Sequence, residues 1–296
     1  MALPFSDFLV AVARPVARLL RLPHLPEHFP TLFYAFLAFT AMHLYISPFF
    51  SARIFPISYG KLRTPRAVNQ WCWSFARNIQ MVSLLHVFVV LSLAVSCFGS
   101  ETLEADKLWG WDDRVGTTVA VACGYFLWDT LDAAINFDDL GFLIHGASCF
   151  TLYMMTFRPF LGYFAPRFLT WELSTIFLNI HRFLDKTGYT GSKAQWVNGV
   201  ILLSTFFSVR IVYGWYLTFN FMKALYGARN ELSVVYLLCF ALGNLTLNSL
   251  NIIWFYKMIF AVRKRFDNEA RPLRAAAEGA SDAASALSAT GNAPAA

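Results

Sequence analysis

The sequence predicts an all-α fold: a polytopic membrane bundle of about seven transmembrane helices, six of them surrounding a central cavity. Composition is the first indication, because 57% of the 296 residues are hydrophobic and only 14% are charged, against about a quarter in soluble domains. The second is a succession of apolar stretches of about 20 residues, the length at which a helix crosses a bilayer. The third is that polar side chains recur inside these stretches at helical spacing. These features exclude a soluble enzyme, a disordered chain and a disulfide-stapled secreted domain.

The N-terminal segment, 1–30, is predicted to form an amphipathic helix that lies on the membrane surface. Its apolar run is too short for a cleavable signal peptide and is interrupted by Arg14. Apolar residues recur at helical spacing opposite three arginines: Phe5, Phe8, Leu9, Val12, Val16, Leu19 and Leu20 against Arg14, Arg18 and Arg21.

Seven apolar stretches are then long enough to be membrane spans. We place them at about 31–50, 78–98, 115–133, 139–156, 159–181, 196–221 and 232–261. The fourth is short and contains Gly141 and Gly146. Because no stretch alternates polar and apolar residues as a barrel strand does, the spans are predicted to be helices.

These elements divide the chain into four parts. An interfacial segment (1–30) precedes a first transmembrane helix with its cytosolic loop (31–70) and a six-helix membrane domain (71–261). The last part, 262–296, consists mainly of Ala, Ser and Gly with scattered charges. Such a composition cannot build a core, so we expect a disordered cytosolic tail.

The distribution of Lys and Arg predicts the orientation. Basic residues are concentrated in the loop after the first span, around 182–193, and at 263–265, whereas the 101–113 loop is acidic. The positive-inside rule therefore predicts a cytosolic C-terminus and a lumenal N-terminus, although the three N-terminal arginines oppose this assignment. We interpret the net charge of +6 as an orientation signal and a contact with lipid surfaces, and not as a nucleic-acid site.

Polar residues within the spans are the candidates for function. An ionised side chain at mid-bilayer costs roughly 3 kcal/mol, so each one needs a partner or a polar cavity. We expect the polar faces to converge on a pocket open toward the cytosol. The candidate ligand-binding residues are His86, Tyr125, Glu172, Asn179, Arg210, Asn248 and Asn251. Structural roles remain open for several of them, since the Asn residues can join helices and Glu172 with Arg210 can form a buried ion pair.

Asp129 and His145 are the candidate catalytic pair. A carboxylate beside an imidazole fixes its tautomer and raises its basicity, which makes the imidazole a proton acceptor near neutral pH. A purely structural role is equally open. The five cysteines contain no Cys-x-x-Cys pair, so we predict neither a disulfide framework nor a metal site.

Several of these residues stand in motifs that resemble the TLC-domain family, which includes ceramide synthases and translocon-associated TRAM proteins. The resemblance covers about 71–261. Its pieces are Trp-Ser-Phe-Ala-Arg at 73–77, Ser-Leu-Leu-His at 83–86, Gly-Tyr-Phe-Leu-Trp-Asp at 124–129, His145, Glu-Leu-Ser-Thr-Ile-Phe-Leu-Asn at 172–179 and Asn-Ile-Ile-Trp-Phe at 251–255. The run at 172–179 looks most like the non-synthase, TLC domain-containing branch. His145 is flanked by Ile144 and Gly146, so only one of the paired histidines of the synthases remains.

The resemblance implies six helices around a membrane-embedded cavity, residence in the endoplasmic reticulum and a role in lipid handling. Our first hypothesis is a lipid-homeostasis protein that binds a lipid or acyl chain, requires no cofactor and influences membrane lipid composition. The alternative is a ceramide-synthase-like acyltransferase with acyl-CoA as co-substrate and His145 as base or acyl acceptor, positioned by Asp129. A translocation factor or a transporter remains open.

Overall fold

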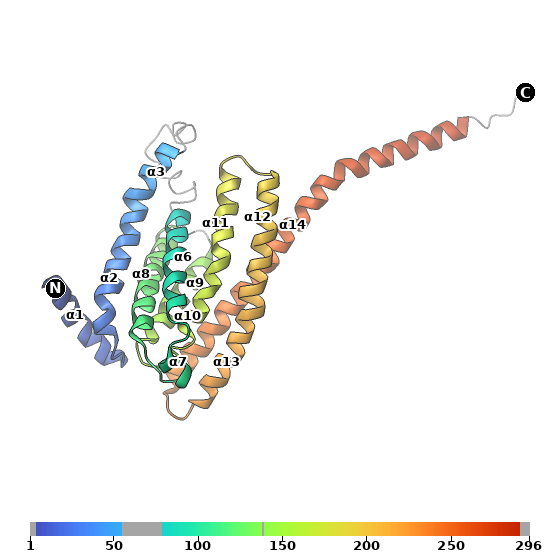
Figure 1. The fold of residues 1–296 in the computed structure, drawn as a ribbon. Coiled ribbons are helices and arrows are strands. Elements are labelled where there is room, and N and C mark those ends of the chain that lie inside the picture. Colours follow the sequence, from blue (N-terminus) through green and yellow to red (C-terminus); the bar gives the residue numbers. More distant parts are fainter. Residues whose placement is uncertain (1–3, 55–78, 138, 291–296) are drawn as a thin grey trace, which may run out of the picture. The chain divides into compact units, whose positions relative to one another are not determined.

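The computed structural model describes residues 4–54, 79–137 and 139–290, and all regular secondary structure in these residues is helical (Figure 1). The chain divides into a compact unit, Met1–Asn251, and a second unit, Ile252–Ala296. The helices are α1 (Pro4–Leu20), α2 (Leu25–Ala41), the π-helix η1 (Met42–Ile46), α3 (Ser47–Ile54), α6 (Ile79–Ser96), α7 (Glu101–Ala105), α8 (Asp113–Ile135), α9 (Leu140–Met155), α10 (Ala165–Phe168), the 3₁₀ helix η2 (Leu169–Glu172), α11 (Leu173–Lys186), α12 (Lys193–Phe206), the π-helix η3 (Phe207–Val212), α13 (Tyr213–Gly227) and α14 (Val234–Thr290).

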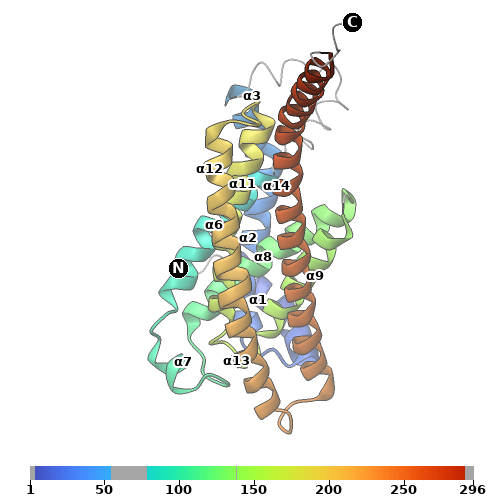
Figure 2. The ribbon, with the colours of Figure 1, turned by 90° about the vertical axis from the view of Figure 1, so that its right-hand side faces the viewer.

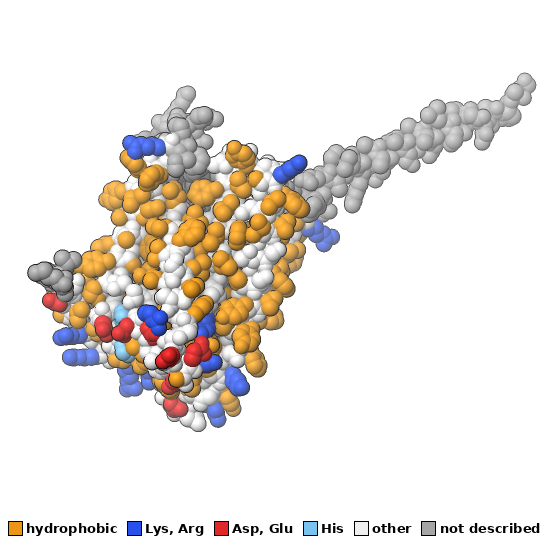
Figure 3. All heavy atoms as spheres, in the orientation of Figure 1, with side chains coloured by type: hydrophobic (Ala, Val, Ile, Leu, Met, Phe, Trp, Pro, Cys, Tyr) orange, Lys and Arg blue, Asp and Glu red, His pale blue; other side chains and the backbone are white. Residues whose placement is uncertain are grey.

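Within the described residues, four helical stretches are long and apolar enough to cross a membrane: Leu25–Phe50, Asp113–Ile135, Lys193–Gly227 and Val234–Arg263. Met81–Ser96 and Leu140–Met155 are shorter apolar helices. In Figure 3, hydrophobic side chains cover the middle of the visible face, while charged residues gather at its lower end. The all-α membrane bundle predicted from composition is confirmed.

The fifth predicted span, 159–181, is wrong as a single helix. The structure has turns over 156–164, then the short helices α10 and η2, and only then α11. Pro159 and Pro166 cannot donate a helical hydrogen bond, and Leu161 has a left-handed backbone with φ 59°. This broken segment creates the floor of the site described below.

Helix α1 forms where the amphipathic segment is predicted, and it has three faces. Leu9, Ala13 and Ala17 are buried, and α1 contacts α2. A second face consists of exposed apolar side chains, among them Val12 at 47% and Leu19 at 82% exposure. Arg14 and Arg18 are exposed on the remaining face. This arrangement suits a bilayer surface, and the interfacial position itself stays a prediction.

Helix α8 is the centre of the bundle. It contacts α2, α6, α9 and α10, and its buried residues contribute to the main hydrophobic cluster. Two glycines allow the close approach of its neighbours: a Cβ on Gly124 would lie 2.7 Å from the carbonyl oxygen of Leu32 in α2, and one on Gly146 of α9 would lie 2.8 Å from Thr130 Oγ1. Small residues at such contacts are typical of membrane helix packing.

Helices α12, η3 and α13 form one continuous stretch, Lys193–Gly227, and a turn then joins α13 to α14 (Figure 2). The π-helical turn η3 interrupts the regular repeat and carries Arg210. Helix α14 continues to Thr290, which differs from the disorder expected over 262–296. Alanine, abundant in the tail, has the highest intrinsic helix propensity, which explains the difference.

Candidate functional site

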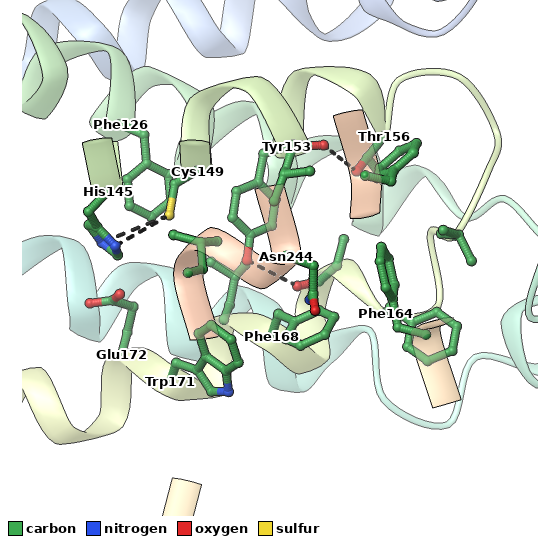
Figure 4. A pocket seen from close by; sticks show the side chains of 17 residues that line it. Phe126, His145, Cys149, Tyr153, Thr156, Phe164, Phe168, Trp171, Glu172 and Asn244 are labelled. Atoms are coloured by element: carbon green, nitrogen blue, oxygen red, sulfur yellow. Dashed lines mark hydrogen bonds between the residues drawn. The ribbon is translucent and has the colours of Figure 1, made fainter. Parts of the chain in front are cut away.

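A cavity lies within the Met1–Asn251 unit (Figure 4). Its walls come from α8, α9, the 156–164 turns, α10, η2, α13 and α14, so the predicted cavity is formed by part of the bundle. The lining residues are Phe126, His145, Cys149, Leu152, Tyr153, Thr156, Leu161, Phe164, Ala165, Phe168, Leu169, Trp171, Glu172, Phe221, Phe240, Asn244 and Leu247.

The two ends of the cavity differ in chemistry. His145, Cys149 and Glu172 lie at one end, where Figure 4 shows the Glu172 carboxylate beside the His145 imidazole. The other end is lined by aromatic residues, including Phe164 and Phe221, whose ring centroids are 5.6 Å apart. The cavity is therefore amphipathic along its length.

Glu172 reaches the cavity because the 3₁₀ helix η2 ends at this residue and α11 begins directly after it. Glu172 is 8% exposed, and its Oε1 lies 3.6 Å from the nearest guanidinium nitrogen of Arg210. This distance is longer than a hydrogen bond. The ion pair compensates the carboxylate charge while leaving its lone pairs free to accept hydrogen bonds from a ligand.

Arg210 lies behind Glu172 and does not line the cavity. Its Nε donates to the Trp171 carbonyl at 3.0 Å and to Ser174 Oγ at 2.9 Å. Its two terminal nitrogens donate to Asn251 Oδ1 at 3.1 Å and to Thr175 Oγ1 at 3.0 Å. Arg210 thus joins η3 to the start of α11 and to α14, and it fixes the backbone that carries Glu172.

His145 lines the cavity, and its ring nitrogens lie 3.8 and 3.9 Å from Cys149 Sγ, one helical turn further along α9. Asp129 is not a lining residue. Its carboxylate lies against Gly146, where an added Cβ would be 3.0 Å from Oδ2. The catalytic pairing of Asp129 with His145 stays a prediction, and Glu172 is the carboxylate that shares the cavity with His145.

The other candidates lie outside the cavity. His86 is fully buried and stacks on Tyr125 with centroids 3.6 Å apart, and Asn179 Nδ2 donates to Ser83 Oγ at 3.2 Å in the same region. Asn248 Nδ2 donates to Thr218 Oγ1 at 2.9 Å, which joins α14 to α13. Asn248 thus has the helix-joining role, while Asn251 is a partner of Arg210.

Sequence reasoning missed Cys149, Tyr153 and Asn244 as lining residues. The signals were present, since Cys149 follows His145 by one helical turn and Asn244 begins the row of asparagines in α14. The aromatic end of the cavity gave no signal, because thirty phenylalanines are spread along the chain.

The opening of the cavity toward the cytosol stays a prediction. From His145 the cavity extends to the 156–164 turns, where the Leu161 amide donates to the Leu108 carbonyl at 2.7 Å. Nearby, Arg167 forms a 2.7 Å ion pair with Glu104 of α7. The cavity therefore extends toward the acidic 101–113 loop, which is the predicted lumenal side.

Fold and site together define a class: a helical membrane protein with an amphipathic cavity between its helices. A family model of the TLC domain matches residues 77–260. The chain belongs to the TLC-domain family.

The chain is similar to three curated proteins, two of which are named TLC domain-containing proteins. An uncharacterized TLC domain-containing protein of Schizosaccharomyces pombe is 34% identical over 261 residues, covering 87% of each chain. Human TLC domain-containing protein 4 is 28% identical over 76% of this chain and 85% of its own. Topoisomerase I damage affected protein 4 of Saccharomyces cerevisiae is 24% identical over 86% of this chain and 93% of its own. The resemblance to the non-synthase branch is thereby confirmed.

Proposed function

We propose that this protein binds a lipid or acyl chain in the cavity and thereby influences membrane lipid composition in the endoplasmic reticulum. The observation that carries the proposal is the arrangement of the cavity, with Glu172 and His145 at one end and aromatic side chains at the other. An acyl chain matches the aromatic end, because sites that bind apolar groups are lined mainly by hydrophobic and aromatic side chains.

The polar end favours a head group that donates hydrogen bonds. The Glu172 carboxylate accepts hydrogen bonds, and its Oε1 lies 3.6 Å from a guanidinium nitrogen of Arg210. A hydroxyl or amine on the ligand would satisfy the carboxylate, and a buried acceptor without a donor costs about 1–3 kcal/mol. An anionic head group would be repelled by Glu172.

Leu247→Phe tests occupancy, because Leu247 lines the cavity and is 7% exposed. The larger ring fills part of the volume, so the purified variant should carry several-fold less co-purifying lipid by mass spectrometry. Leu245→Phe is the matched control, since Leu245 lies two residues away on α14 and is 52% exposed. Purified protein without lipid, together with an unchanged lipid profile after deletion, would contradict the proposal.

Glu172→Gln tests the polar end separately. The amide retains the shape and one acceptor but removes the charge, so bound lipids should shift away from amine-bearing species while neutral lipids remain. Because the substitution also leaves Arg210 without its anion, folding must be checked by gel filtration. An identical lipid spectrum in wild-type protein and variant would exclude Glu172 as the head-group partner.

An acyltransferase is the second candidate, supported by the position of His145 inside the cavity. There the imidazole can take the proton of a lipid amine that attacks the acyl-CoA thioester, or can itself accept the acyl group from acyl-CoA and pass it to the amine; either route releases the coenzyme A thiol. Incubation of purified protein with acyl-CoA and a long-chain amine decides between the candidates. Product formed by wild-type protein and lost in His145→Ala supports the enzyme, whereas no product, or equal product from both, leaves lipid binding alone.

A further inference from the structure

A second cluster of potential ligand groups lies at the first turns of α2 and α8, outside the cavity. Glu27 and His28 come from α2, and Asp113 comes from α8. One ligand atom of each residue lies within 4.8 Å of the others. Asp113 is more than 80 positions from Glu27 and His28 in the sequence, and no local motif indicates that the three residues meet.

The two carboxylates alone do not indicate a ligand. Glu27 and Asp113 are exposed and stand in the first turns of their helices, where negative side chains are stabilised by the helix dipole. Each is thus explained without a bound ion.

His28 is the residue that the helix dipole does not explain. Its side chain is 6% exposed, and among the described residues its Nε2 has no hydrogen-bond partner. The ring is enclosed by α8, since a Cβ on Gly116 would lie 2.1 Å from Nε2. A buried polar atom without a partner costs free energy, and His28 belongs to a group with two carboxylates.

Trp111 contacts both Asp113 and His28 and holds their side chains in place. Its indole Nε1 donates to Asp113 Oδ1 at 2.9 Å, and its ring centroid is 5.9 Å from that of His28. The His24 ring also stacks on Trp111, with ring centroids 3.9 Å apart. Such outer hydrogen bonds orient the ligands of metal sites.

We propose that Glu27, His28 and Asp113 bind a zinc ion that joins α2 to α8. One imidazole nitrogen and two carboxylate oxygens are a ligand set that Zn²⁺ accepts, with water in the fourth position. Mg²⁺ and Ca²⁺ prefer oxygen ligands throughout. The ion joins α2, which precedes the matched TLC domain at 77–260, to a central helix of that domain.

The test uses the full-length protein in detergent, stripped with a chelator and then dialysed against ZnCl₂. We expect about one bound zinc per chain by elemental analysis, and a higher thermal unfolding midpoint with zinc than without. Glu27→Gln and Asp113→Asn should each weaken zinc binding at least ~10-fold, because a ligand matters at least as much as the outer partners whose loss costs 10–100-fold. Both side chains are exposed, so both variants should fold.

Three comparisons make the result specific. Glu101→Gln, an exposed acidic residue in the first turn of α7, should bind zinc as the wild type does. Trp111→Phe, which removes the hydrogen bond to Asp113, should weaken binding without abolishing it. No saturable binding below millimolar zinc, or unchanged binding in both Glu27→Gln and Asp113→Asn, overturns the proposal.

Discussion

Arg210 shows how one side chain in the apolar bundle is compensated. Four hydrogen bonds and the ion pair with Glu172 surround a side chain that is 5% exposed. Substitution by Met leaves the Glu172 carboxylate buried without a cation. Removing one partner of a buried pair typically costs about 3–5 kcal/mol, so Arg210→Met should lower the free energy of unfolding by that amount. Denaturant titration in micelles, followed by tryptophan fluorescence, measures it.

The comparison for this prediction is Arg229→Met, which removes an exposed arginine whose guanidinium donates to the nearby Tyr226 carbonyl and lies over the Tyr226 ring. Its effect should be within about 0.5 kcal/mol, as for most surface substitutions. The double variant Arg210→Met with Glu172→Gln should recover part of the loss, because no net charge is then buried. Equal costs for Arg210→Met and Arg229→Met would show that the polar cluster contributes little to stability.

Asp112 gives the fold a dependence on acid. It precedes α8, caps the helix by accepting from the Arg114 amide, and is held by the Arg114 guanidinium, with Ser100 Oγ donating at 2.6 Å. The hydrogen bonds from Arg114 lower the pKa of Asp112 from 3.8 to about 2. Because the pKa is lower in the folded state, the stabilisation is complete above pH 3.8 and disappears as the pH falls through about 2.

Asp112→Asn isolates this contribution. Asn retains the cap, since both residues are good N-caps, but it loses the charged pair with Arg114. The variant should unfold at a lower temperature than wild type at pH 7, and the two should converge as the pH approaches 2. A difference in unfolding temperature that is constant from pH 7 to pH 2 would contradict the assignment.

At the scale of helices, hydrophobicity located most elements correctly, because a helix that crosses the bilayer needs about 20 mostly apolar residues. Six of the seven predicted spans correspond to apolar helices of the structure, four of them long enough to cross a membrane. The broken segment around Leu161 was missed because its composition is as apolar as a span, and only Pro159, Gly162 and Pro166 marked the break. Hydropathy averages over a window and does not register backbone geometry.

The candidate site was only partly predictable for a related reason. The sequence identifies polar residues in apolar helices, and Glu172 and His145 do line the cavity. It does not determine the rotation of each helix, so His86 and Asn179 were assigned to the cavity although they belong to a separate buried cluster. The choice between these two locations depends on helix packing, and glycines such as Gly124 control that packing.

Gly124→Ala tests the packing of α2 on α8. The new Cβ would lie 2.7 Å from both the Leu32 carbonyl oxygen and Ala35 Cβ, so the backbones must separate. We expect a loss of about 1–3 kcal/mol, the usual cost of overpacking, measured by denaturant titration in micelles. Gly227→Ala is the control, because no atom lies within 4 Å of its added Cβ; equal stability of the two variants would refute a tight contact at Gly124.

At the scale of the molecule, the distribution of basic residues over the two ends of the bundle is less one-sided than the loop sequences indicate. The broken segment and the α13–α14 turn place Arg158, Arg167 and Arg229 toward the same end as α7. The predicted lumenal end is therefore less acidic than the 101–113 loop alone indicates. The opposite end includes the α11–α12 turn with Lys193.

The orientation also bears on the choice between the two functions, because the cavity extends toward the α7 end and acyl-CoA is a cytosolic co-substrate. We predict that this end is lumenal, since the first loop, the 182–193 region and the tail retain most of the basic residues. A glycan acceptor on a flexible insert after Lys107 should be glycosylated in microsomes. The same insert after Tyr189, an exposed residue in the α11–α12 turn, should remain unmodified. Glycosylation at Tyr189 and not at Lys107 would invert the topology and direct the cavity to the cytosol, where acyl-CoA has direct access to it.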